Sequence, residues 1–357
     1  MDRKIKIIGL LFASLSLVIS SGVAAAKSDA LQKYLGRNEE SVESQLQTLE
    51  TEQLIEEIDA IASTEETDDK LMPFVSALFE KKNKVQDSQL LKVVKDKTKA
   101  DKTRLAMVDL YLHKHEKEPI TEELKELLKS PDINETVKTK IVAGAKFSGK
   151  DVPLLKELIA KDDALVAFHS LKQLTNANAK EAYTIASEIL SNLDVAPKDK
   201  VSAALKSTAK YLKKQTPTPK NDLKAEEEFL NLSFKLIETS DDGYLKDSAF
   251  FAVSDLQSEK AMKKIIESNS VDRELKVFAI DQNFATLKKM LQTNPTESDI
   301  KVVVEAMKLY PIVDLADALE NAVKTVNNPP LKQEAKDTIT LMKEQGVKGN
   351  EKWLDKN

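Results

Sequence analysis

The chain has 357 residues, with 54 Lys and Arg against 59 Asp and Glu and a formal net charge of −5. It contains no cysteine, which excludes a disulfide framework and a thiol for lipid acylation, and its acidic balance argues against nucleic acid as a general partner. Glycine is scarce while Leu, Ala, Lys and Glu are abundant, a composition that favours helix throughout.

Residues 1–26 have the pattern of a signal peptide. Three basic residues precede an apolar stretch over 7–19, and the small residues Ala24 and Ala26 satisfy the cleavage rule. We predict cleavage after Ala26; the alternative is an uncleaved membrane anchor, for which the apolar stretch is short. The remaining chain, with a formal net charge of −7, is expected to be soluble in the periplasm, in the cell-wall space or outside the cell.

Residues 27–69 are predicted to form an acidic N-terminal helical or capping segment, of which residues 38–69 are also compatible with partial disorder. Within it, residues 38–69 carry 12 acidic side chains and no Lys or Arg. Two lysine-rich stretches follow, each with eight Lys: residues 81–102 with three Asp, and residues 198–224 with two Asp. Such segregation predicts an acidic end and basic patches on the folded chain.

A short pattern recurs along the chain: an apolar pair of residues that closes a helix, a polar turn with Asp, Asn or Ser, and a new helix. The first residues of successive pairs are 34, 31, 31, 47, 29 and 25 residues apart. A unit of about 30 residues is one helical hairpin, which buries its apolar stripe only by stacking on its neighbours. The pairs are Val93-Val94, Leu127-Leu128, Leu158-Ile159, Ile189-Leu190, Leu236-Ile237, Ile265-Ile266 and Met290-Leu291.

The helix after each turn is predicted to bury one stripe of apolar residues. Leu165, Phe168, Leu171 and Leu174 recur at helical spacing in one such helix, and the stretch from Leu275 to Ala279, including Phe278, does so in another.

These hairpins resemble the short HEAT-like repeats of bacterial helical solenoids. The resemblance is carried by residues 152–159 with 164–167, and by residues 241–246 with Ala249 and Ala252. Where the family has Val-Arg at the start of the second helix, this chain has Lys246 and Lys276. The resemblance covers most of residues 70–290 and implies an all-α fold, a right-handed α-solenoid of antiparallel hairpins, and a binding role.

A proline-rich break interrupts the series at Gln215–Pro219. We place a boundary near residue 217, between a first block of repeats over 70–216 and a second block over 217–357 with a C-terminal cap. An ordinary long loop between adjacent repeats is the alternative.

Four lysines of the helix predicted over 200–214 form a candidate basic surface: Lys206, Lys210, Lys213 and Lys214. Such a surface suits an anionic wall polymer, an anionic lipid surface or an acidic protein. Alternatively, these lysines are only the solvated face of an amphipathic helix whose Val201, Ala204, Leu205, Thr208 and Leu212 face inward.

Candidate chemistry is sparse. His113 and His115 are two positions apart on a helix and point away from each other, whereas His113 and Glu116 share a face but need two more ligands for a metal site. His169 lies in an apolar stripe, and no nucleophile motif accompanies it. The spacing around Asp241-Asp242-Gly243 does not fit a calcium-binding loop, so we predict helix capping there. We therefore predict no catalytic residues, no metal and no cofactor.

The sequence thus predicts an exported, non-enzymatic helical repeat protein that docks a protein partner on the surface lined by the second helices of the hairpins. Electrostatic adhesion to an anionic cell-wall polymer or lipid surface is the alternative. A helical enzyme that acts on a glycan is the third hypothesis, since paired carboxylates are abundant but aromatic platforms are few.

Overall fold

The computed structural model describes residues 46–64, 68–161, 163–193, 195–214 and 220–349. In these ranges the regular structure consists of the α-helices α4 to α21, two short 3-10 helices and one isolated parallel bridge between Ile312 and Val347. The predicted all-α class is confirmed. The predicted cleavage site at Ala24 and Ala26 and the proline-rich break at 215–219 lie outside the described residues.

The chain divides into two compact units, Met1–Lys146 (unit 1) and Phe147–Asn357 (unit 2). None of the helices in the described part is both long enough and apolar enough to span a bilayer.

Unit 1 is organised around α7, which packs on α4, α6 and α9, while α4 also packs on α5 and α8 on α9. Met107, Val108 and Leu110 of α7 are completely buried, together with Ile58 of α4 and Leu90 of α6. The helices of unit 1 are α4 (Thr51–Ala62), α5 (Asp68–Glu80), α6 (Asp87–Lys95), α7 (Asp101–Lys114), α8 (Glu122–Lys129) and α9 (Glu135–Gly144).

In unit 2, as in unit 1, helices that follow each other in the chain pack together. Its helices are η1 (Gly149–Asp151), α10 (Val152–Lys161), α11 (Ala164–Ala177), α12 (Ala179–Leu190), α13 (Lys198–Lys214), α14 (Lys220–Thr239), α15 (Gly243–Asp255), α16 (Glu259–Glu267), α17 (Arg273–Gln282), α18 (Phe284–Gln292), α19 (Glu297–Leu309), η2 (Val313–Leu315), α20 (Ala316–Val323) and α21 (Pro329–Gln345).

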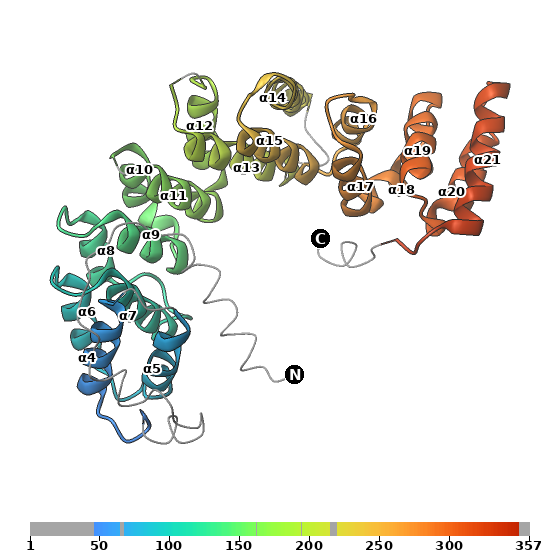
Figure 1. Ribbon diagram of the computed structural model, residues 1–357. Coiled ribbons are helices and arrows are strands. Elements are labelled where there is room, and N and C mark those ends of the chain that lie inside the picture. The colour runs from blue at the N-terminus through green and yellow to red at the C-terminus, as the bar shows by residue number, and fades with distance from the viewer. Residues whose placement is uncertain (1–45, 65–67, 162, 194, 215–219, 350–357) are drawn as a thin grey trace. The chain divides into compact units, whose positions relative to one another are not determined.

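The helices of unit 2 lie in two rows, with α10, α12, α14 and α16 in one and α11, α13, α15 and α17 in the other (Figure 1). Within the second row, α11 packs on α13 and α13 packs on α15, in addition to the contacts between chain neighbours. One apolar core extends through unit 2 from Leu155 to Met342 and includes buried residues of both rows. The second row therefore presents one side to this core and leaves the other side available to solvent.

Each apolar pair predicted to close a helix lies in the C-terminal part of a helix: α6, α8, α10, α12, α14, α16 and α18. Three of these pairs share a further feature, because a basic side chain donates to the carbonyl oxygen of their second residue. Arg104 Nε reaches Val94 O at 2.9 Å, Lys200 Nζ reaches Ile159 O at 2.9 Å, and Lys276 Nζ reaches Ile266 O at 2.8 Å. These donors satisfy carbonyl groups that the end of a helix leaves without an intrahelical partner.

Polar residues of the turns cap several of the following helices as expected. Asn134 Oδ1 accepts from the N–H of Val137 at 3.0 Å, and Asp242 Oδ1 accepts from the N–H of Tyr244 at 2.9 Å. Capping therefore accounts for Asp242, as predicted. Asp163 and Asp272 occupy the same position at α11 and α17 without a side-chain cap.

The predicted inward residues of α13 are buried, and Lys206 and Lys210 are exposed. Two other residues predicted to be buried are not: Leu165 of α11 is 45% exposed and Phe278 of α17 is 41% exposed. Both lie on helices of the second row, and other residues of these helices fill the core, among them Leu171, Leu174 and Ile280. The apolar stripe on these helices is thus wider than the core they cover.

Candidate functional site

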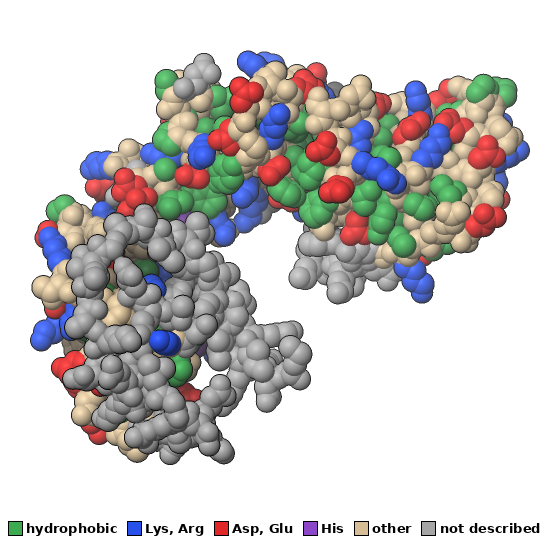
Figure 2. Space-filling model, in the orientation of Figure 1, with side chains coloured by type: hydrophobic (Ala, Val, Ile, Leu, Met, Phe, Trp, Pro, Cys, Tyr) green, Lys and Arg blue, Asp and Glu red, His purple; other side chains and the backbone are tan. Residues whose placement is uncertain are grey.

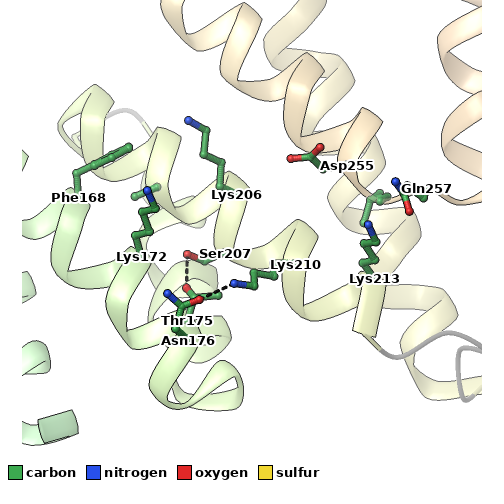
Figure 3. A pocket seen from close by; sticks show the side chains of 12 residues that line it. Phe168, Lys172, Thr175, Asn176, Lys206, Ser207, Lys210, Lys213, Asp255 and Gln257 are labelled. Carbon is green, nitrogen blue, oxygen red and sulfur yellow. Dashed lines mark hydrogen bonds between the residues drawn. The ribbon is translucent and has the colours of Figure 1, made fainter. Parts of the chain in front are cut away.

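A groove of about 930 Å³ crosses α11, α13 and α15 of unit 2. The groove lies on the second row of helices. Figure 3 shows its side chains projecting from the three helices. The lining residues are Phe168, Lys172, Thr175, Asn176, Ala203, Lys206, Ser207, Lys210, Lys213, Asp255, Leu256 and Gln257.

Hydrogen bonds between α11 and α13 fix one side of the groove. Thr175 Oγ1 donates to the carbonyl oxygen of Leu171 at 2.7 Å and lies 2.8 Å from Ser207 Oγ, and both hydroxyl-bearing residues are buried. At the surface, Lys210 Nζ donates to Asn176 Oδ1 at 2.5 Å (Figure 3). These contacts hold together α11 and α13, the helices that carry Lys172 and Lys206 into the groove lining.

The groove is predominantly basic, since it is lined by four lysines and a single carboxylate, Asp255. Lys206 Nζ lies 5.5 Å from the centre of the Phe168 ring, an arrangement in which the ring face stabilises the ammonium group. Removal from bulk water raises the pKa of the Asp255 carboxyl, and the nearby charges of Lys213 and Lys206 offset this only in part. Four lysine side chains in one groove favour an anionic ligand.

An aromatic cluster borders the groove on α15 and α17. Phe251 lies one turn before Asp255 on α15, and its ring centre is 5.4 Å from that of Phe278 in an edge-to-face arrangement. Both rings also contact the buried Phe250. Phe251 is 38% exposed and Phe278 41% exposed. Figure 2 shows hydrophobic side chains reaching the surface along the side of unit 2 on which α15 and α17 lie.

The structure brings three of the four sequence-predicted lysines into the groove: Lys206, Lys210 and Lys213. The side chain of Lys214 lies outside the described residues. Sequence reasoning missed Lys172, Asp255 and Phe251. A signal for Lys172 was present, because it follows Leu165 and Phe168 at helical spacing on one face of α11.

None of the three histidines lines the groove: His113 and His115 belong to unit 1, and His169 lies behind the lining residue Phe168. His113 Nε2 is 2.9 Å from Lys82 Nζ, and its Nδ1 is 3.7 Å from Glu116 Oε2, whereas His115 lies between Asp87 and Glu118. Burial and the charge of Lys172 lower the pKa of His169, which packs against Phe168. No group of three or more His, Asp or Glu side chains among the described residues is arranged to hold a metal ion.

His115 is expected to make the stability of unit 1 depend on pH. Burial opposes protonation of its ring, but hydrogen bonds to Glu118 (2.8 Å) and Asp87 (2.9 Å) outweigh this and raise its pKa above 6.5. Protonated His115 therefore stabilises folded unit 1. This contribution to the unfolding free energy is fully present below about pH 6.5 and is lost as the pH rises through the folded-state pKa of His115. We expect His115→Gln to lower the unfolding free energy by about 1 kcal/mol at about pH 5.5 and by less at about pH 8, measured by urea unfolding. A loss of the same size at both pH values would contradict this assignment.

No protein-family model matches this sequence, and a search of curated proteins also finds no match. The class of the protein therefore rests on its own structure: an all-helical chain in which successive helices pack in pairs, with a basic groove bordered by exposed aromatic rings.

Proposed function

We propose that this chain is an exported, non-enzymatic helical repeat protein that docks a partner protein in the groove across α11, α13 and α15. The observation that carries the proposal is the placement of this groove on three successive helices of one row. Repeat proteins built from helical hairpins bind their ligands on such a continuous surface. The two rows of helices and the recurrent basic donor on the closing carbonyl support a HEAT-like solenoid for unit 2.

A protein partner accounts for the mixed character of the groove. The partly exposed Phe168 supplies apolar surface above the buried Ala203 and Leu256, Lys172 and Lys206 supply charge, and Asn176 and Gln257 supply amide groups. Protein interfaces combine an apolar centre with a polar rim in this way. An anionic polymer or a lipid headgroup would pair with the lysines but would make few contacts with the apolar surface.

Site-specific photo-crosslinking tests this proposal. A photoreactive residue is placed at Asn176 in the groove and, as the matched control, at Glu188, an exposed residue of α12 in the other row. We expect the processed, exported chain to crosslink one discrete protein from position 176 and not from position 188. The crosslink should be lost when Lys206→Glu and Lys210→Glu are added. Equal labelling from both positions, or no discrete product from position 176, would overturn the proposal.

Adhesion to an anionic surface is the second candidate, because four lysines line one groove. It predicts binding that falls steeply with salt, since each neutralised anion releases counterions. Sedimentation of the purified chain with cell-wall material or anionic vesicles at low and high salt distinguishes it from protein docking, which retains a salt-resistant component.

A further inference from the structure

We infer that the groove recognises an extended acidic peptide segment that carries an aromatic or large apolar residue at one end. This inference rests on the proposed function and specifies the chemistry of the partner. In this arrangement the acidic end of the peptide lies over α11 and α13, and its apolar end lies against Phe251 and Phe278.

The charge at one end of the site selects an acidic ligand. Lys172 of α11 and Lys206, Lys210 and Lys213 of α13 line the same groove, and Asp255 stands on the α15 side. A ligand therefore meets attraction over α11 and α13 and one repulsive carboxylate at α15. This asymmetry places the acidic residues of the ligand away from α15.

The exposed aromatic rings at the other end select an apolar residue. Phe251 and Phe278 form a T-shaped pair at 5.4 Å, and the fully buried Phe250 supports them from beneath. Because Phe250 fixes these rings, they lose little conformational freedom when a ligand covers them. Rigid, partly exposed aromatic side chains of this kind are typical anchors of protein interfaces.

The spacing of the helices sets the length of the segment. α11 packs on α13 and α13 on α15, and the rings of Phe251 and Phe278 join α15 to α17. With about 8–10 Å for each of these steps, the path from α11 to α17 is about 30 Å long. An extended chain covers about 3.3 Å per residue, which gives a segment of about nine residues. A free phosphate or a single lipid headgroup is too short to reach both ends, so engagement of both ends identifies a polymer with an apolar side chain.

A designed peptide tests the inference with the processed full-length chain. The probe is a fluorescein-labelled peptide of about nine residues, with a block of Glu at one end, a Gly-Ser spacer and a Phe pair at the other. In fluorescence anisotropy we expect Lys206→Glu with Lys210→Glu to weaken binding about thirtyfold, and Phe251→Ser with Phe278→Ser to weaken it about tenfold. Asp255→Asn should tighten binding about threefold, because it removes the one repulsive charge.

Control ligands give the outcomes that would overturn the inference. A peptide with Ser in place of the Phe pair should bind no better to the wild type than to the Phe251→Ser, Phe278→Ser variant. Vesicles containing phosphatidylglycerol and inorganic polyphosphate represent an anionic surface and an anionic polymer. If either of these ligands binds through the lysines, and the phenylalanine variants do not change binding of the peptide, the groove recognises a simple polyanion. That result would overturn the inference.

The inference and the proposed function fail in different ways. If crosslinking from position 176 captures a discrete protein but the acidic-aromatic peptide does not bind, the docking function stands and the ligand chemistry is wrong. If the peptide binds as expected but crosslinking captures no protein, the site recognises this chemistry and the docking function is wrong.

Discussion

Replacing Phe250 with alanine is expected to lower the unfolding free energy of unit 2 by about 3–5 kcal/mol. Phe250 is 1% exposed, belongs to the continuous core of the unit, and contacts Phe251 and Phe278 at ring-centre distances of 5.4 and 6.4 Å. Alanine removes the ring, leaves a cavity and also removes the two ring contacts. The measurement is urea unfolding followed by far-ultraviolet circular dichroism, with hydrogen exchange to locate the loss in α13 to α16.

The neighbouring phenylalanine provides the matched control. Phe251 has the same chemistry and lies on the same helix, but it is 38% exposed, so Phe251→Ala should cost less than about 1.5 kcal/mol. We expect this variant to be folded and to bind the acidic-aromatic peptide weakly. Equal destabilisation by the two substitutions would show that Phe251 belongs to the core and not to a binding surface.

Replacing Asp59 with alanine is expected to destabilise unit 1 by about 2–3 kcal/mol. Asp59 of α4 accepts hydrogen bonds from the N–H of Ala100 at 3.0 Å and from Thr103 Oγ1 at 2.9 Å, and Lys99 Nζ lies 3.0 Å away. The carboxylate thus caps the start of α7 from a different helix, and α7 is the helix on which α4, α6 and α9 pack. Hydrogen exchange at the start of α7, together with urea unfolding, measures the effect.

Two further variants separate the cap from general charge effects. Asp59→Asn retains an oxygen that accepts the same bonds but loses the charge, so it should recover about half of the lost free energy. Glu56→Ala removes an exposed carboxylate one turn earlier on α4 and should change stability by less than about 0.5 kcal/mol. A large effect of Glu56→Ala would indicate that net charge, and not the cap, stabilises unit 1.

The all-α class and the positions of several helix ends were predictable from local signals. The apolar pairs such as Val93-Val94 and Ile265-Ile266 predicted where helices end, because the last turn of a helix must be buried while the turn after it is solvated. Arg104 was not recognised, since its role depends on a carbonyl group ten positions earlier in the chain. No periodicity of the sequence encodes such a contact directly.

The candidate site was predictable only in part. The lysines of α13 were recognised because four of them stand close together in sequence, but Lys172 and Asp255 reach the groove from other helices and depend on how α11, α13 and α15 pack. Phe278 was predicted to lie in the core because its spacing matched an apolar stripe. Periodicity identifies which residues share a face of a helix. How many of these residues are buried depends on how much of that face the neighbouring helices cover.

The packing of α13 determines how the width of the groove can change. In unit 2 the principal partners of each helix are at most three helices away in the chain, and α13 is the helix that packs on both α11 and α15. The separation of the two walls is therefore set by two interfaces, α11 with α13 and α13 with α15. A tilt of α13 alone opens or narrows the groove. Local unfolding of α21 changes the groove only if the helices between α21 and α15 also move.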